Sequence, residues 1–170
     1  MLNPKIAKLL NQQVTKEFHS SYLYLDMSNY YYDNNLNGFG NWFDVQTKEE
    51  HAHAMLFVQY LRNNGEKITL EVIDAPTFEF KNFKEPLDEA LKHEYYITNS
   101  INEIYAEAYA VKDFRTMQFL DWFVKEQGEE EQNTEDLCKR YDLFGTDAKG
   151  LYLLNSELAA RVFTAPSLVI

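Results

Sequence analysis

The scarcity of helix-breaking residues is the feature that most limits how this sequence can fold. Its 170 residues include only 6 Gly and 4 Pro, so long stretches contain nothing that would interrupt a helix. Within these stretches the apolar residues recur at intervals of three and four, which is the spacing of one helix face. The pattern predicts an all-α protein.

Five helices are predicted, and caps and breakers set their boundaries. Asn3 and Pro4 suit the cap and the first turn of the first helix, and Gly65 suits the end of the second. The short link at 33–40 should make the first two helices antiparallel neighbours. The expected helices cover residues 4–32, 41–64, 83–111, 114–144 and 151–163.

Residues 66–82 form a long connection without helical rhythm. Extended at ~3.3 Å per residue, they could span more than a helix of roughly 25 residues at ~1.5 Å each. We expect a crossover that returns along the bundle, so that the second and third helices run parallel. A two-stranded hairpin over the alternating segment 67–73 is the competing interpretation. Four long helices with one long crossover form a known bundle topology, and the short fifth helix would need covering, most simply by another subunit.

The size and net charge of the chain limit the classes of function that it can have. The chain is expected to form a single domain over residues 1–170, and 45% of its residues are apolar, which favours a globular fold. Its net charge of −11 disfavours binding to nucleic acid or to an anionic membrane and attracts cations. The lone Cys138 and the absence of a long apolar N-terminal segment favour a reducing cytoplasm. The sequence contains no run of about 18 apolar residues, so no membrane-spanning helix is predicted.

Acidic residues interrupt the apolar faces of all four long helices. A single Glu in such a helix is usually exposed to solvent, so each one alone predicts little. Their spacing is more informative, because Glu17 precedes Glu50 by 33 residues and Glu94 precedes Gln127 by the same interval. In both pairs the second member is followed, three residues later and on the same helix face, by another potential metal ligand. Those two residues are His53 and Glu130.

Two helix pairs built on one plan approach the di-iron carboxylate arrangement of helical bundles. The sequence also resembles prokaryotic non-haem ferritins over essentially its whole length. The matching residues are Glu17, Tyr24, Glu49, Glu50, His53, Glu94, Glu126, Gln127, Glu129 and Glu130. The resemblance implies a homo-oligomeric shell of 24 subunits in the cytoplasm. It also implies ferroxidase activity that oxidises Fe²⁺ with dioxygen or hydrogen peroxide and stores the ferric mineral.

The resemblance further implies roles for these residues. The first iron would take Glu17, Glu50 and His53. The second would share Glu50 as a bridge and add Glu94, with some help from Glu130. A third, outer iron would use Glu49, Glu126, Glu129 and Glu130. Gln127 would form a hydrogen bond near the pair, and Tyr24 would donate an electron or a hydrogen bond.

Related families fit less well. Haem-binding bacterioferritins have a second Glu-x-x-His and a haem-ligating Met after the bridging Glu, where this chain has Gln127-x-x-Glu130 and His51, so no haem is expected. Rubrerythrin-like peroxidases need a Cys-x-x-Cys module, which one cysteine cannot supply. The mini-ferritins that coat DNA do not use this ligand set.

Animal ferritins carry acids at an iron channel where this chain has Met117 and Leu120. We therefore consider a route along each subunit's own site, through Glu49, Glu126 and Glu129. Unchanged Fe²⁺ uptake after charge reversal of these three acids would contradict that route.

Other polar residues have simpler explanations. His51 is expected at the surface, and His19 and His93 lie about 100° or more round their helices from the ligand positions, so we expect them to be exposed. Cys138 is expected to be a small, partly buried side chain. The alternative for the whole chain is a non-enzymatic structural or regulatory bundle whose acidic faces meet solvent.

Overall fold

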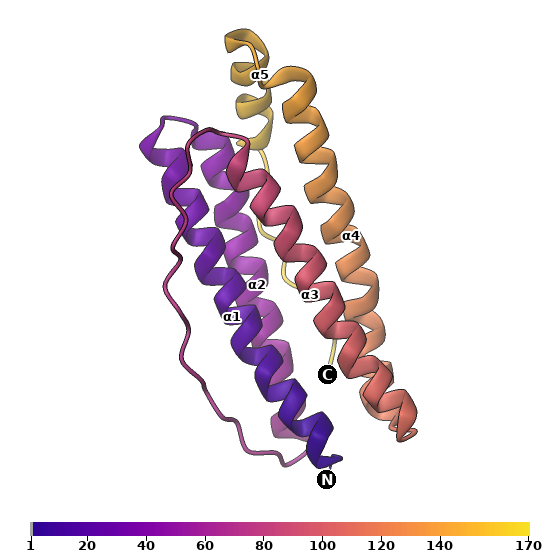
Figure 1. Ribbon diagram of the computed structural model, residues 1–170. Helices are drawn as coiled ribbons and strands as arrows, with labels where there is room; N and C mark the ends of the chain where they lie inside the picture. Colours follow the sequence, from indigo (N-terminus) through magenta and orange to yellow (C-terminus); the bar gives the residue numbers. More distant parts are fainter. Residues whose placement is uncertain (1) are drawn as a thin grey trace.

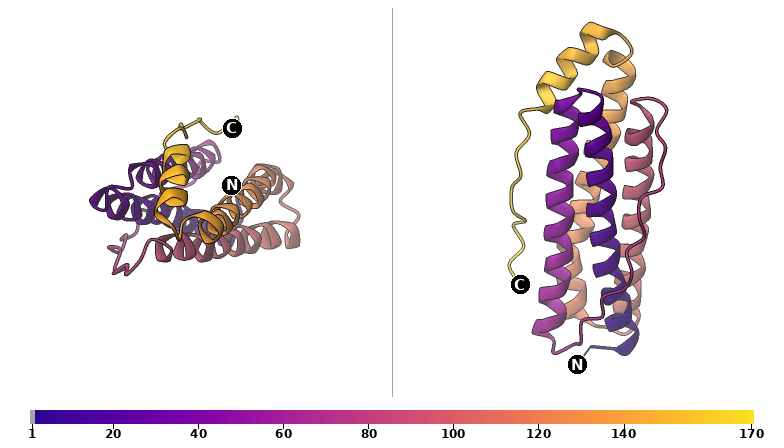
Figure 2. Two further views of the ribbon diagram at one scale, coloured as in Figure 1. Left: turned by 90° about the horizontal axis from the view of Figure 1, so that it is seen from above. Right: turned by 90° about the vertical axis from the view of Figure 1, so that its left-hand side faces the viewer.

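Four long helices lie side by side as a bundle, and a fifth short helix crosses one end of it (Figures 1 and 2). The computed structural model describes residues 2–170, in which there are helices and no strand. The helices are α1 (Pro4–Asp33), α2 (Asn37–Asn63), α3 (Glu85–Ala110), α4 (Phe114–Phe144) and α5 (Ala148–Leu158). The all-α bundle predicted from the sequence is confirmed.

The crossover between α2 and α3 runs back along the length of the bundle, so these two helices are parallel (Figure 1). Asn11 of α1 fixes its start: its Nδ2 donates to Lys67 O at 3.2 Å, and its Oδ1 accepts from Thr69 N at 2.7 Å. The segment's own backbone groups form no ladder within residues 2–170, and the competing hairpin interpretation is therefore wrong.

The start of α2 at Asn37, four residues before the predicted start, depends on α5. Asn155 Oδ1 accepts hydrogen bonds from Gly38 N at 2.8 Å and Phe39 N at 3.2 Å, which satisfies N–H groups that a helix start leaves unpaired. A Cβ on Gly38 would lie 1.7 Å from Asn155 O, so only glycine permits this approach. The glycines predicted to form the turn instead belong to the helix.

The predicted boundaries of α5 are also wrong, because the helix covers Ala148–Leu158 instead of 151–163. Asp147 caps its start by accepting from Lys149 N and Gly150 N, both at 3.0 Å. Asn41 of α2 ends it, because Asn41 Nδ2 donates to Leu158 O at 3.2 Å and to Arg161 O at 2.9 Å. The other helix boundaries lie within two residues of their predicted positions.

The apolar face of α5 does not need another subunit to cover it. Leu154 and Leu158 are buried against the chain's own bundle, so the expectation for this stripe is wrong. Val162, expected to extend the stripe, is 75% exposed and lies beyond the end of the helix. In residues 2–170, no helix has both the length and the apolar character needed to cross a lipid bilayer.

The core has two parts, separated along the bundle axis. One apolar cluster contains residues such as Val14, Phe57, Ile97 and Phe123. The other contains residues such as Leu23, Phe43, Ala90 and Leu137. On every long helix, the residues between the two clusters include buried polar side chains. The bundle therefore has a polar middle section closed above and below by apolar packing.

Candidate metal centre

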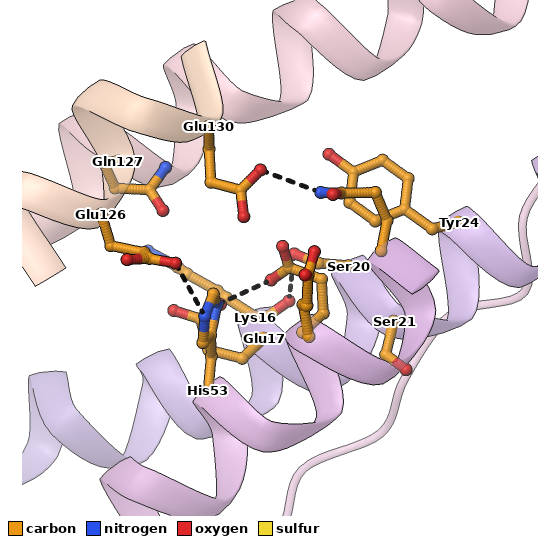
Figure 3. A network of polar contacts seen from close by, with 12 residues as sticks. Lys16, Glu17, Ser20, Ser21, Tyr24, His53, Glu126, Gln127 and Glu130 are labelled. Carbon is orange, nitrogen blue, oxygen red and sulfur yellow. Dashed lines mark hydrogen bonds and ion pairs between the residues drawn. The ribbon is translucent and has the colours of Figure 1, made fainter. Parts of the chain in front are cut away.

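The polar middle section collects one or two functional side chains from each long helix. All are at most 4% exposed. They are Glu17 from α1, Glu50 and His53 from α2, Glu94 from α3, and Gln127 and Glu130 from α4. The helical spacing of three residues puts each α2 and α4 pair on one inward face. Figure 3 shows the labelled members directed into the space between the helices.

The most compact group is Glu17, Glu50 and His53, whose potential ligand atoms all lie within 4.8 Å of one another. His53 Nδ1 is 3.6 Å from Glu50 Oε2. In residues 2–170, Glu17 Oε2 and the Thr15 hydroxyl are the buried side-chain oxygens without a hydrogen-bond partner. A buried carboxylate oxygen that no donor reaches, beside a second carboxylate and an imidazole, suits a divalent cation with mixed oxygen and nitrogen ligands.

Glu94 occupies the opposite side of the section and is held by two donors. The Tyr24 hydroxyl donates to Glu94 Oε1, and Gln127 Nε2 donates to Glu94 Oε2 at 3.2 Å. Tyr24 is itself 1% exposed. Tyr24 and Gln127 therefore orient the Glu94 carboxylate, whose oxygens are potential metal ligands.

Glu130 is oriented by a residue that sequence reasoning missed. Gln46 Nε2 donates to Glu130 Oε2 at 3.0 Å, and Gln13 Nε2 donates in the same manner to Glu17 Oε1 at 2.7 Å. Gln46 precedes Glu50 by four residues, and Gln13 precedes Glu17 by four. Both glutamines lie on the same helix face as a predicted ligand, so the helical spacing could have found them.

The electrostatics of the section favour uptake of a cation. Burial, and then the neighbouring Glu50 carboxylate, raise the pKa of Glu17 well above its ordinary value. Burial and the nearby carboxylates of Glu94 and Glu130 likewise raise the pKa of Glu50. Burial raises the pKa of Glu94 to about 8. Among residues 2–170, no lysine or arginine forms an ion pair with these three glutamates, so no cationic side chain stabilises their ionised form.

The predicted outer acids do not form a compact group. Glu49 Oε2 lies 2.6 Å from Arg161 Nη2, and burial raises the pKa of Glu49 to about 7 although Arg161 acts to lower it. Glu126 Oε1 lies 3.9 Å from His53 Nε2 (Figure 3). Glu129 is 58% exposed and pairs with Lys125 at 3.4 Å. Nothing in the sequence pattern pointed to Arg161, which follows α5.

The remaining histidines differ from each other. His51 is exposed, as expected, and packs the edge of its ring against Phe18. The expectation of exposure is wrong for His19 and His93, which are half-buried with ring centroids 5.9 Å apart. Ser20 Oγ lies 2.6 Å from His93 Nε2, and burial lowers the pKa of His93 to about 4. These two rings pack between α1 and α3 and were misjudged because helix position alone does not show what a neighbouring helix covers.

Comparison with known proteins identifies relatives that resemble this chain in sequence and fold. The family model described as a ferritin-like domain matches residues 7–144. A bacterial non-heme ferritin of Campylobacter jejuni is 35% identical over 158 residues, covering 93% of this chain and 95% of the relative. A bacterial non-heme ferritin of Staphylococcus saprophyticus is 35% identical over 163 residues, covering 96% and 98%. A closed form of the Archaeoglobus fulgidus ferritin, engineered by mutagenesis, superposes with a TM-score of 0.94 at 36% identity, covering 96% of this chain and 100% of that one.

Proposed function

This chain belongs to the ferritin family, and on that premise we propose that it is an iron-storage protein with ferroxidase activity. Two Fe²⁺ ions would bind in the polar middle section, and each would give one electron to dioxygen or to hydrogen peroxide. The ferric product would pass to a mineral inside a shell of 24 subunits in the cytoplasm.

The observation that carries the proposal is the buried set of carboxyl groups around Glu17 Oε2, with which no lysine or arginine of residues 2–170 forms an ion pair. Several acids at low exposure repel one another, and burial without a partner is unfavourable for any charged group. A structural bundle gains nothing from this arrangement. A divalent ion supplies the missing positive charge, and carboxylates stabilise Fe³⁺ more than Fe²⁺ because Fe³⁺ carries the greater charge.

The residues have separate roles in this proposal. One iron is held by Glu17, Glu50 and His53. The other is held by Glu50, Glu94 and Glu130. Glu50 bridges the two ions and lowers their mutual repulsion. Because the pKa values of Glu17, Glu50 and Glu94 are raised by burial, their carboxyl groups release protons as iron binds.

The supporting residues keep the ligands in position. Gln127 and Tyr24 orient Glu94, and the hydroxyl of Tyr24, which donates to that carboxylate, would supply a further electron or a hydrogen bond when iron is bound. The third, outer ion would draw on Glu49, Glu126, Glu129 and Glu130.

An anaerobic Fe²⁺ titration tests the proposal. We expect at least two tight ions per subunit, which Glu50→Ala abolishes because the bridging carboxylate is lost. Glu103→Ala is the matched control, since Glu103 is an exposed acid on α3, outside the polar section. Oxygen consumption after addition of Fe²⁺ should fall in Glu50→Ala alone. An intact chain that binds no Fe²⁺ would contradict the proposal and favour the non-enzymatic bundle.

A further inference from the structure

The C-terminal strap, defined here as residues 159–170, runs extended from α5 along the bundle beside α2 (Figure 2). Arg161 attaches its first part to α2. Its last part is attached to α4, where Trp122 Nε1 donates to Ser167 Oγ at 3.2 Å. Leu168 packs against the apolar cluster that contains Val14 and Phe123. The strap therefore joins α2 and α4 across the height at which the outer acids lie.

The side chain of Arg161 makes four contacts, all with one stretch of α2. Its Nη1 donates to Trp42 O at 3.1 Å, and its guanidinium carbon lies 4.5 Å from the centroid of the Trp42 ring. Its Nη2 donates to Glu49 Oε2 at 2.6 Å and to Gln46 Oε1. The side chains of Arg161 and Glu49 are only 22% and 19% exposed. This is a partly buried, geometrically fixed ion pair, unlike the exposed pairs that contribute little.

Gln46 connects this ion pair to the inner site. Its Oε1 accepts from Arg161, and its Nε2 donates to Glu130 at 3.0 Å. One amide thus links the strap to a carboxylate that the proposed function gives to both the second and the third iron. The Arg161 guanidinium and the Glu130 carboxylate therefore bind the same amide, and the guanidinium also binds Glu49.

We propose that Arg161 is a built-in competitor for the outer metal ion, because its guanidinium neutralises the Glu49 carboxylate and so weakens the binding of a divalent cation there. The inference deepens the proposed function and rests on its assignment of the outer acids. The guanidinium lies 2.6 Å from Glu49 Oε2 and already offsets the charge of this carboxylate, so a divalent cation bound to Glu49 would be repelled by it and would compete for the same negative charge. On this proposal the outer ion binds less tightly than it would without the guanidinium.

Calorimetric titration of the metal-free, full-length protein tests this, with Fe²⁺ under argon and with redox-inert Zn²⁺ in parallel. Arg161→Gln should tighten binding of the outer ion by on the order of tenfold and leave the inner ions unchanged. Arg161→Lys, which keeps a cation, should behave nearly like the parent. Arg140→Gln is the matched control, because it removes the same charge from a surface pair with Glu157 on α5.

The outcomes separate this inference from the function on which it rests. An outer-ion affinity that is equal in Arg161→Gln, Arg140→Gln and the parent overturns the competitor role, even when the inner ions bind as expected. Tightening in Arg161→Gln alone supports it. A parent that fails to bind the inner ions contradicts the proposed ferroxidase site itself. Far-UV circular dichroism and the unfolding temperature establish that the Arg161 variants are folded.

Discussion

Glu17, Glu50 and Glu94 sit where an isolated amphipathic helix would have placed apolar side chains, and the sequence revealed them through spacing. The shared interval of 33 residues works because antiparallel helices joined by short links return each residue to the height of its partner. Helical spacing would also have identified Gln13 and Gln46, and the same kind of argument covers both residues. It does not cover Arg161, because the position of Arg161 depends on how an extended strap, without any period, lies on the bundle.

At the residue scale, the raised pKa of Glu94 makes the metal-free protein sensitive to pH. The unfolded chain ionises Glu94 near its ordinary pKa of about 4.3, whereas the folded chain keeps its proton until the pKa of about 8. Between these values the folded state binds more protons, so stability falls as pH rises, by at most about 1.4 kcal/mol per pH unit from this group. Above about pH 8 its contribution is constant.

Thermal unfolding in chelator from pH 5 to pH 8 measures this effect. Glu94→Gln should flatten the decline of the unfolding temperature, because one titrating group is removed while the amide retains hydrogen-bonding capacity. The exposed Glu103→Gln on the same helix should follow the parent curve. A Glu94→Gln curve as steep as that of the parent would contradict the assigned cause.

At the element scale, the four long helices were predictable because their boundaries depend on residues close to them in sequence. Asn3 accepts from Lys5 N, Asp113 accepts from Thr116 N, and Gly65 has a φ of 71°. The start of α5 also has a local cap, Asp147, which sequence reasoning overlooked, whereas the two other boundaries that failed depend on distant partners. Asn155 caps the start of α2 and Asn41 ends α5, and neither contact leaves a local signal.

The contact between α2 and α5 leads to a prediction about two glycines. Gly38→Ala would put a methyl group 1.7 Å from Asn155 O, so α5 must shift and the free energy of unfolding should fall by about 1–3 kcal/mol. Gly128→Ala on α4 meets nothing within 4 Å and should raise it by about 0.5–1 kcal/mol. Denaturant titrations of both variants provide the comparison. Equal stability of Gly38→Ala and the parent would show that α5 is not held at this contact.

At the scale of the whole molecule, apolar side chains gather at the junction of α4 and α5 although the chain's own core is complete. Phe144 is 52% exposed, Tyr152 69% and Leu153 57%. Such patches on a folded chain mark sites of association. They support assembly of subunits through this end of the bundle, by residues other than the Leu154 and Leu158 stripe that the chain's own bundle covers.

Leu153→Glu tests that assembly. A charge at this position should break the subunit contact and lower the mass measured by light scattering from that of a shell toward the 20.0 kDa of one chain. Helix content should not change, because Leu153 contributes nothing to either apolar cluster. Leu153→Met keeps the apolar character and should keep the mass. A full-sized shell formed by Leu153→Glu would exclude this face from assembly.

The position of the polar middle section between two apolar clusters also sets how far an ion must travel. Along the bundle axis, either direction is closed by several layers of buried hydrocarbon. Sideways, the section lies beneath a single helix, about 10 Å thick with its side chains. Under the proposed function, an ion would therefore enter or leave the section sideways, over a distance that does not depend on the length of the helices. The helical turns above and below the polar section contribute rigidity, and the sideways path to it is about the width of one helix.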